Sequence, residues 1–222
     1  MQETDLHADL KRYLLRAGGS SEVQIDGFLI DLVTDGLLLE IQTRNFSALK
    51  NKLAKLLTCY PLRVVHPISR DLWILLKEKD GMTIHRRKSP RKGRLEFLFF
   101  ELVHIAEWID HPNFSLQVLL ISEEQERVRD GTGSWRRRGV RIHNRRLMDI
   151  FESYTFLSPS DYRIFLPFPP DFMFSNAELA DQLSISTKLA AKMTYSLFAA
   201  GLLGKSRIGR TNQYWLVNSQ GN

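Results

Sequence analysis

The sequence is poor in cysteine, and this scarcity excludes two kinds of site. Cys59 is the single cysteine among 222 residues, so an internal disulfide and a cysteine-rich zinc site are both ruled out. Such usage is typical of the reducing cytoplasm. The apolar, helix-like pattern around Cys59 predicts a core residue rather than a nucleophile.

Long hydrophobic runs are also missing. No apolar stretch approaches the length of a membrane span, and the first residues are amphipathic and charged, unlike a secretory signal. We therefore expect a cytoplasmic protein that has no membrane partner.

The signatures of several common enzyme classes are absent as well. The six histidines form no H-x3-H pair, which argues against a histidine zinc site. There is no G-x-S-x-G motif, no Walker loop and no dinucleotide-binding fingerprint. A serine hydrolase, a nucleoside triphosphatase and a dinucleotide-dependent enzyme are therefore disfavoured.

What the chain does have is an excess of positive charge and a clear pattern of apolar residues and turn residues. Its net charge of +6 fits an anionic partner without identifying one. In the first 84 residues, apolar periodicity and the turn pairs Asp26-Gly27 and Asp35-Gly36 predict the order α-β-β-β-α-β-β, a mixed α/β domain. The expected elements are a helix over 4–16, strands over 22–25, 28–33 and 37–43, a helix from Ser47 to Pro61, and strands over 62–67 and 72–76.

Two carboxylates are expected at one end of this small sheet. Asp31 closes one apolar run, and Glu40 and Gln42 occupy alternate positions in the next, so these last two share a face of the strand. Two carboxylates beside a hydrogen-bonding amide can bind Mg²⁺ and activate a water. The plain alternative is that Asp31 begins a turn and that Glu40 pairs with a lysine on an exposed sheet face.

The order α-β-β-β-α-β, with Ile30-Asp31 on its second strand and Glu40-Ile41-Gln42 on its third, resembles the PD-(D/E)XK nuclease superfamily over roughly residues 1–80. The resemblance implies a restriction-endonuclease-like core in which Asp31 and Glu40 ligate Mg²⁺ or Mn²⁺. It also implies that a glutamate of the first helix joins the metal, where Glu3 fits by position and Glu22 is the other candidate. Many relatives cut DNA as dimers, so a homodimer is implied too.

The chain departs from the family pattern at position 42, which is usually lysine. Gln42 carries no charge and can orient a water only by hydrogen bonds. The following helix offers Lys50, Lys52 and Lys55, and some relatives place the functional lysine there, so Lys52 is the predicted substitute, although helix lysines more often form a solvated face. The expected catalytic residues are Asp31, Glu40, Gln42 and Lys52.

Beyond residue 84 the sequence predicts two further regions. Residues 85–158 are expected to form a basic linker (85–94) and an α+β extension. Residues 159–222 are expected to form a winged helix-turn-helix domain. In the extension we expect a long helix over 95–109, a strand over 114–122 and a short helix over 147–156. In the C-terminal domain we expect a capping box at Ser175–Glu178, a helix from Thr187 to about Ala200, a basic loop over 204–210 and a strand over 213–217.

Basic side chains in these regions are the candidate DNA contacts. Arginine and lysine on loops bind phosphates without reading sequence, and the helix after the turn would enter a major groove. The alternatives are a strand edge guarded by charge and a winged helix that docks protein. The candidate DNA-binding residues are Arg86, Arg87, Lys88, Arg136, Arg137, Arg138, Thr187, Lys188, Lys192, Arg207 and Arg210.

Together these features predict a Mg²⁺-dependent DNA endonuclease that acts on duplex or branched DNA. The main competitor is a catalytically inactive DNA-binding protein or transcription regulator that keeps a nuclease-shaped domain, which the lack of lysine at position 42 favours. The third possibility is a nuclease directed at RNA, although the winged helix favours DNA.

Overall fold

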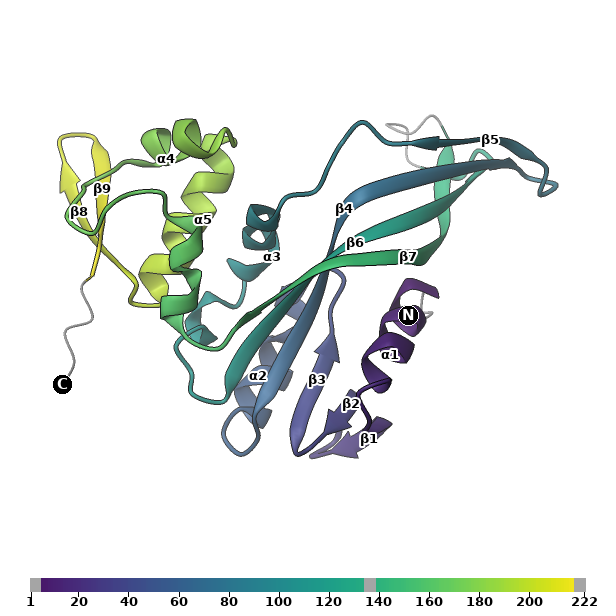
Figure 1. The fold of residues 1–222 in the computed structure, drawn as a ribbon, viewed down its shortest axis with the longest axis horizontal. Helices are drawn as coiled ribbons and strands as arrows, with labels where there is room; N and C mark the ends of the chain where they lie inside the picture. Colours follow the sequence, from purple (N-terminus) through teal and green to yellow (C-terminus); the bar gives the residue numbers. More distant parts are fainter. Residues whose placement is uncertain (1–4, 134–138, 218–222) are drawn as a thin grey trace.

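A large mixed β-sheet forms the centre of the protein (Figure 1). The computed structural model describes residues 5–133 and 139–217. The sheet has seven strands in the order β1-β2-β3-β4-β6-β7, with β5 paired to β4. Strand β4 runs parallel to both β3 and β6, and the other pairs are antiparallel. The strands are β1 (Ser20–Ile25), β2 (Phe28–Thr34), β3 (Leu37–Ile41), β4 (Leu62–Glu78), β5 (Thr83–Lys88), β6 (Phe114–Arg129) and β7 (Val140–Phe156).

The first three strands form where the turn signals predicted them. Asp26 and Gly27 have φ values of 47° and 81°, and Asp35 and Gly36 have 46° and 78°. Positive φ at both central residues is what a tight two-residue hairpin requires, and Asp and Gly tolerate it best. The β1-β2-β3 meander is therefore fixed locally and confirms the predicted element types.

Helices cover both faces of this part of the sheet. Helix α1 (Asp5–Leu15) buries Leu6 and Leu10 against Leu39 and Ile41 of β3. On the other face, η1 (Phe46–Leu49) and α2 (Lys50–Leu56) pack in the cluster that contains Leu38. Since side chains alternate along a strand, Glu40 points to the α2 face. None of the helices in the described ranges is long and apolar enough to cross a membrane.

The sheet runs on past residue 84. Strand β4 pairs with β6 from Leu62 to Glu78, and β6 pairs with β7, so the region predicted as an extension shares its sheet with the N-terminal region. The expected strands over 62–67 and 72–76 are one strand of 17 residues, whose pairing with β6 shifts register between Ser69 and Asp71. The segment predicted as a linker over 85–94 begins as part of β5, which pairs with β4.

The helix predicted over 147–156 is wrong, and a bulge explains the error. These residues belong to β7, where Ser122 and Glu123 of β6 face Asp149 and Leu147, so Met148 is an extra residue. A bulge of this kind brings residues three apart onto one face, and Leu147 and Ile150 both pack against the α1 cluster. That spacing imitates a helix in the sequence.

Two further predictions were wrong. The segment 95–109 is not one long helix but three short pieces, η2 (Leu95–Leu98), α3 (Phe99–Leu102) and η3 (Ala106–Trp108). All three pieces contact α5, and the segment also lies in the main core. Because it packs against both α5 and the core, its backbone bends between short helical pieces instead of forming one straight helix.

Cys59 is exposed, because it follows the end of α2 and Leu56 and Leu57 take the core positions.

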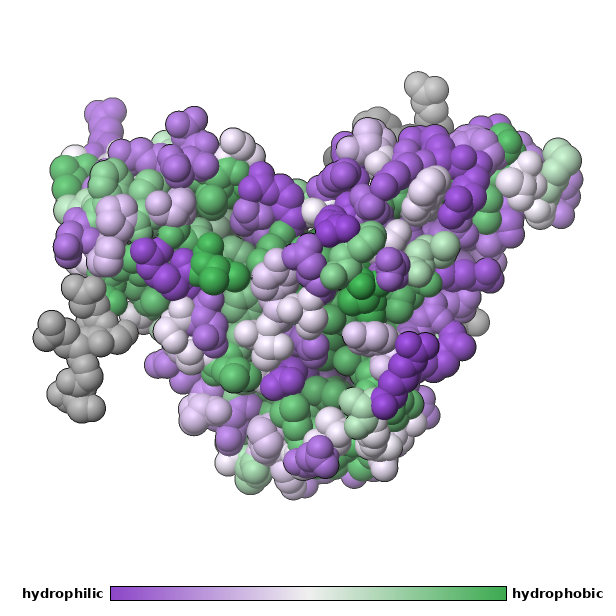
Figure 2. Space-filling view, in the orientation of Figure 1, coloured by the Kyte–Doolittle hydropathy of each residue, from purple (hydrophilic) through white to green (hydrophobic). Residues whose placement is uncertain are grey.

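The C-terminal elements form where their caps predicted them. Ser175 and Glu178 make a reciprocal capping box at the start of α4 (Asn176–Leu183), and Ser186 caps α5 (Thr187–Ala199). A hairpin of β8 (Leu203–Ile208) and β9 (Thr211–Leu216) follows, so the basic loop expected over 204–210 is mostly strand, with the turn at residues 209–210. A 3-10 helix, η5 (Pro159–Phe165), leads into this region from β7. Figure 2 shows a notch in the surface between this C-terminal lobe and the far ends of β4 to β7.

Candidate functional site

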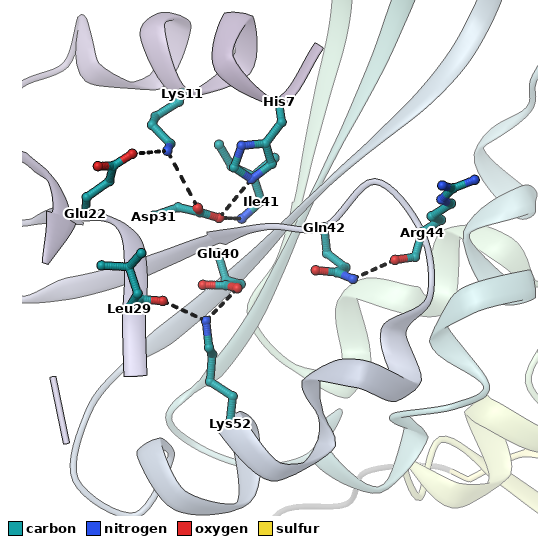
Figure 3. Close-up of polar contacts among 10 residues, drawn as sticks. All are labelled: His7, Lys11, Glu22, Leu29, Asp31, Glu40, Ile41, Gln42, Arg44 and Lys52. Atoms are coloured by element: carbon teal, nitrogen blue, oxygen red, sulfur yellow. Dashed lines mark hydrogen bonds and ion pairs between the residues drawn. The ribbon is translucent and has the colours of Figure 1, made fainter. Parts of the chain in front are cut away.

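The predicted carboxylates lie side by side where β2 and β3 stop pairing. Leu32 and Leu39 are the last paired residues, and Asp31 directly precedes Leu32 while Glu40 directly follows Leu39. Asp31 lies toward helix α1 and Glu40 toward helix α2 (Figure 3). The two predicted ligands are therefore neighbours in space, held by elements on opposite faces of the sheet.

Asp31 is held in place by hydrogen bonds. Its Oδ2 accepts a bond of 2.8 Å from the Ile41 amide and lies 3.2 Å from His7 Nε2. Lys11 Nζ lies 3.9 Å from Oδ1 and 3.1 Å from Glu22 Oε1. Burial by itself raises the pKa of Asp31, but the bonds from His7 and Ile41 and the charge of Lys11 outweigh it, so the pKa lies below its ordinary value. Asp31 is therefore ionised at neutral pH.

Glu40 is buried and only partly satisfied. Its side chain is 12% exposed, and Lys52 Nζ lies 2.7 Å from Oε1. The second oxygen, Oε2, is buried and has no hydrogen-bond partner among the described residues. Burial and then the negative charge of Asp31 raise the pKa of Glu40, and Lys52 opposes both. A lysine does pair with Glu40, but in a buried position rather than on an exposed face of the sheet.

Lys52 contacts Glu40, whereas Gln42 does not. Lys52, on α2, also donates a bond of 2.9 Å to the Leu29 carbonyl, which fixes its ammonium group at the carboxylate. Gln42 turns away, and its Nε2 donates to the carbonyls of Arg44 (2.6 Å) and Asn45 (3.2 Å) (Figure 3). Strand β3 ends at Ile41, so the alternation that would have set Gln42 beside Glu40 no longer applies.

The other candidate ligands are placed less centrally. Glu3 lies outside the described residues. Glu22 accepts a hydrogen bond from Lys11, whose ammonium group lies between Glu22 and Asp31. His7 and Lys11 were missed by the sequence reasoning, although their spacing of four residues on a helix places both on one face, directly beside the apolar pair Leu6 and Leu10.

The donor set suits Mg²⁺ or Mn²⁺ in kind. Mg²⁺ is usually held by one or two carboxylates and keeps several waters, so Asp31 and Glu40 fit this requirement. A cation at Glu40 Oε2 would satisfy the buried oxygen and relieve the repulsion between the two carboxylates. Within the part of the chain that the structure describes, no group of three or more acidic, histidine or cysteine side chains is arranged to hold a metal.

The candidate DNA-binding residues that the structure describes lie on β5, on α5 and on the β8–β9 hairpin, which are separate from the elements that carry Asp31 and Glu40. Arg86, Arg87 and Lys88 are exposed on β5, where Arg86 Nε bonds Glu124 at 2.5 Å and Lys88 bonds Asp71 at 2.8 Å. Arg136, Arg137 and Arg138 fall outside the described residues. Thr187 and Lys188 are exposed on α5, Lys192 is half-buried there, and Arg207 and Arg210 are exposed on the β8–β9 hairpin.

Comparison with known proteins yields one family and one relative of note. Residues 4–157 match the family described as "Domain of unknown function (DUF8091)". The chain is similar to a Treponema pallidum (strain Nichols) protein described as "Uncharacterized protein", with 36% identity over 156 residues, which is 70% of this chain and 62% of that relative. No solved structure matches the chain. The matched region contains the whole seven-stranded sheet and both carboxylates.

Proposed function

The chain belongs to the DUF8091 family, and we propose that it is a metal-dependent endonuclease that hydrolyses phosphodiester bonds in DNA. The element order α1-β1-β2-β3-α2-β4, with β3 parallel to β4, supports the proposal because it resembles the PD-(D/E)XK core. The observation that carries it is the meeting of Asp31 and Glu40, in which one buried glutamate oxygen has no hydrogen-bond partner among the described residues.

Each side chain at this site has a distinct task in the proposed reaction. Asp31 and Glu40 would hold Mg²⁺ or Mn²⁺, which when bound lowers the pKa of a water and neutralises phosphate charge. His7 and the Ile41 amide fix the orientation of Asp31. Lys52 donates one N–H to Glu40 and one to Leu29, and no described residue takes its third N–H, which could serve a water or a phosphate oxygen. We assign to Lys52 the cationic role that PD-(D/E)XK nucleases usually give to a lysine at the place that Gln42 occupies in this chain.

The C-terminal lobe is proposed to hold duplex or branched DNA. Helices α4 and α5 and the β8–β9 hairpin resemble a winged helix-turn-helix, in which the second helix enters the major groove. Lys188, Lys192 and Tyr195 lie at spacings of four and three on α5, and Tyr195 is 58% exposed. A positive, partly aromatic face of this kind fits a DNA partner.

Replacing Lys188 and Lys192 together with alanine is expected to weaken duplex binding about equally for all sequences. Each lost phosphate contact lowers the salt dependence of log K by about 0.9, so the slope falls by nearly 2. Fluorescence anisotropy across salt concentrations measures this change, with Lys79→Ala, an exposed lysine in the β4–β5 turn, as the control. An unchanged slope in the double variant would remove α5 from the DNA interface.

One observation favours a second candidate function, a non-catalytic DNA-binding regulator. Glu40 already has a counter-charge in Lys52, and the described residues offer the metal no third side-chain ligand. In that case the sheet would serve only as a scaffold for the C-terminal lobe.

Titration with Mn²⁺ and Mg²⁺ separates the two functions. The nuclease is expected to bind the ions and to gain about 2.7 kcal/mol of stability at a metal concentration a hundredfold above Kd. Asp31→Asn should lose both the binding and the gain. Calorimetry and thermal unfolding measure the two effects. A wild-type protein that binds neither ion would support the regulator.

A further inference from the structure

The loop that leaves β3 is held at both ends. The His66 Nδ1 atom lies 2.7 Å from the carbonyl oxygen of Gln42 and donates to it. The Gln42 side chain in turn bonds the carbonyls of Arg44 and Asn45, and Asn45 adopts the left-handed conformation with φ at 61°. His66 is buried, and burial lowers its pKa, so its neutral ring is the form that makes this bond. The backbone that carries Arg44 is therefore fixed.

A polar cavity of about 550 Å³ opens beside this loop. Its walls come from the loop itself, from β6 and from β7 near the β6–β7 turn. No carboxylate of the described residues lines it. The polar and charged side chains of its lining include Arg44, Gln125, Arg141, His143, Asn144 and Arg145.

The arginines of this cavity have N–H groups to spare. Arg145 gives Nε and Nη2 to Glu123, and Arg141 gives Nε to Asp130 and Nη1 to the ring of His143. A guanidinium has five N–H donors, so these partners orient both arginines and leave each with donors that no described residue takes up.

Arg44 has the most donors left. Among the described residues no acceptor contacts its guanidinium, which points away from Glu40 in Figure 3. The cavity therefore presents fixed cationic donors to an anion with several oxygens, and the charge of Arg44 is one that no described carboxylate compensates.

We propose that this cavity binds the phosphodiester backbone of the strand that is cut at Asp31 and Glu40, and that Gln42 is a positioning residue that presents Arg44 to it. The inference rests on the proposed nuclease function. Arg44 follows Glu40 by four residues, a chain length that reaches at most about 14 Å. Successive nucleotides of one strand rise by about 3.4 Å, so Arg44 meets a phosphate within about four nucleotides of the cut.

The test is the affinity of a fluorescent single-stranded oligonucleotide, measured by anisotropy in EDTA across salt concentrations. Without metal there is no cleavage, so the result does not depend on catalysis. Arg44→Ala should weaken binding about tenfold and lower the salt slope by about 0.7, the contribution of one phosphate on a single strand. Arg44→Lys should retain part of the slope, and Arg16→Ala, at an exposed arginine just after the end of α1, should behave as the wild type.

Gln42→Ala tests the positioning role. It should weaken binding in the same direction, and Arg44→Ala added to it should cost little more, because both changes remove one contact. Additive losses, or a loss in Gln42→Ala with no change in the salt slope, would overturn the positioning role.

Two outcomes would overturn the cavity as a strand site. One is wild-type affinity and slope in Arg44→Ala while cleavage still depends on Asp31, which leaves the nuclease intact. The other concerns inorganic phosphate titrated into the same proteins. If Arg44→Ala weakens phosphate binding but leaves oligonucleotide binding unchanged, the ligand of the cavity is a free anion. An Arg44-dependent slope in a protein that never cleaves would support the cavity and reject the nuclease, so the two claims fail separately.

Discussion

Lys52→Met is expected to lower metal-dependent DNA cleavage at neutral pH about a hundredfold, in the range seen when one preorganised electrostatic donor is removed. Lys52 is the counter-charge of Glu40 at 2.7 Å, and it opposes the rise in the pKa of Glu40 that burial and Asp31 cause. Without it the pKa of Glu40 rises further, so more of the carboxyl group is protonated and unable to hold a metal. The loss should therefore shrink as the pH is raised.

The pH profile distinguishes this role from simple misfolding. Lys52→Arg should keep most of the activity, and Lys50→Met, on the exposed side of the same helix, should keep all of it. A Lys52→Met protein that cleaves at the wild-type rate with the wild-type pH profile would show that Lys52 has no part in the reaction.

Glu40→Gln is expected to make the metal-free protein more stable while removing its response to metal. The pKa of Glu40 is higher in the folded protein than its ordinary value of 4.5. Its favourable contribution to folding is therefore complete below pH 4.5 and is lost as the pH rises through the folded-state pKa. A neutral amide avoids that loss and replaces the repulsion from Asp31 by an attraction. The expected gain at neutral pH is about 1 kcal/mol, the scale of satisfying one buried polar group.

Chemical denaturation at several pH values measures this effect. The difference between Glu40→Gln and the wild type should close as the pH falls toward 4.5, and Mg²⁺ should stabilise only the wild type. A metal-free variant that is less stable than the wild type at every pH would contradict this account. It would mean that the Lys52–Glu40 ion pair stabilises the fold and that the Glu40 carboxylate does not destabilise it.

Local signals in the sequence were enough for the β1-β2-β3 meander, for the two C-terminal helices and for the carboxylate pair. The Asp-Gly turns fix the meander, and the meander alone brings Asp31 next to Glu40. The C-terminal helices follow from the caps at Ser175 and Ser186. In each case the signal and the structure it specifies lie within a few residues of one another.

The errors came from effects that reach across the fold. The bulge at Met148 depends on the pairing of β7 with β6, and it gave a strand the spacing of a helix. The position of Gln42 depends on where β3 ends, which is set by the bonds of the following loop rather than by alternation. The cavity lined by Arg44 and β7 joins residues about a hundred positions apart, and a sequence read locally gives no sign of it.

The measurement that tests the central claim most directly is a cleavage assay on plasmid and branched DNA in Mg²⁺ and in Mn²⁺. Wild-type protein should nick or cut the DNA only when metal is present, and Asp31→Asn and Glu40→Gln should each lose at least a hundredfold in rate. Asp35→Asn is the matched control, because it makes the same chemical change at a hairpin turn that asparagine tolerates. Cleavage that persists in both site variants, or no cleavage by the wild type in either metal, would contradict the nuclease.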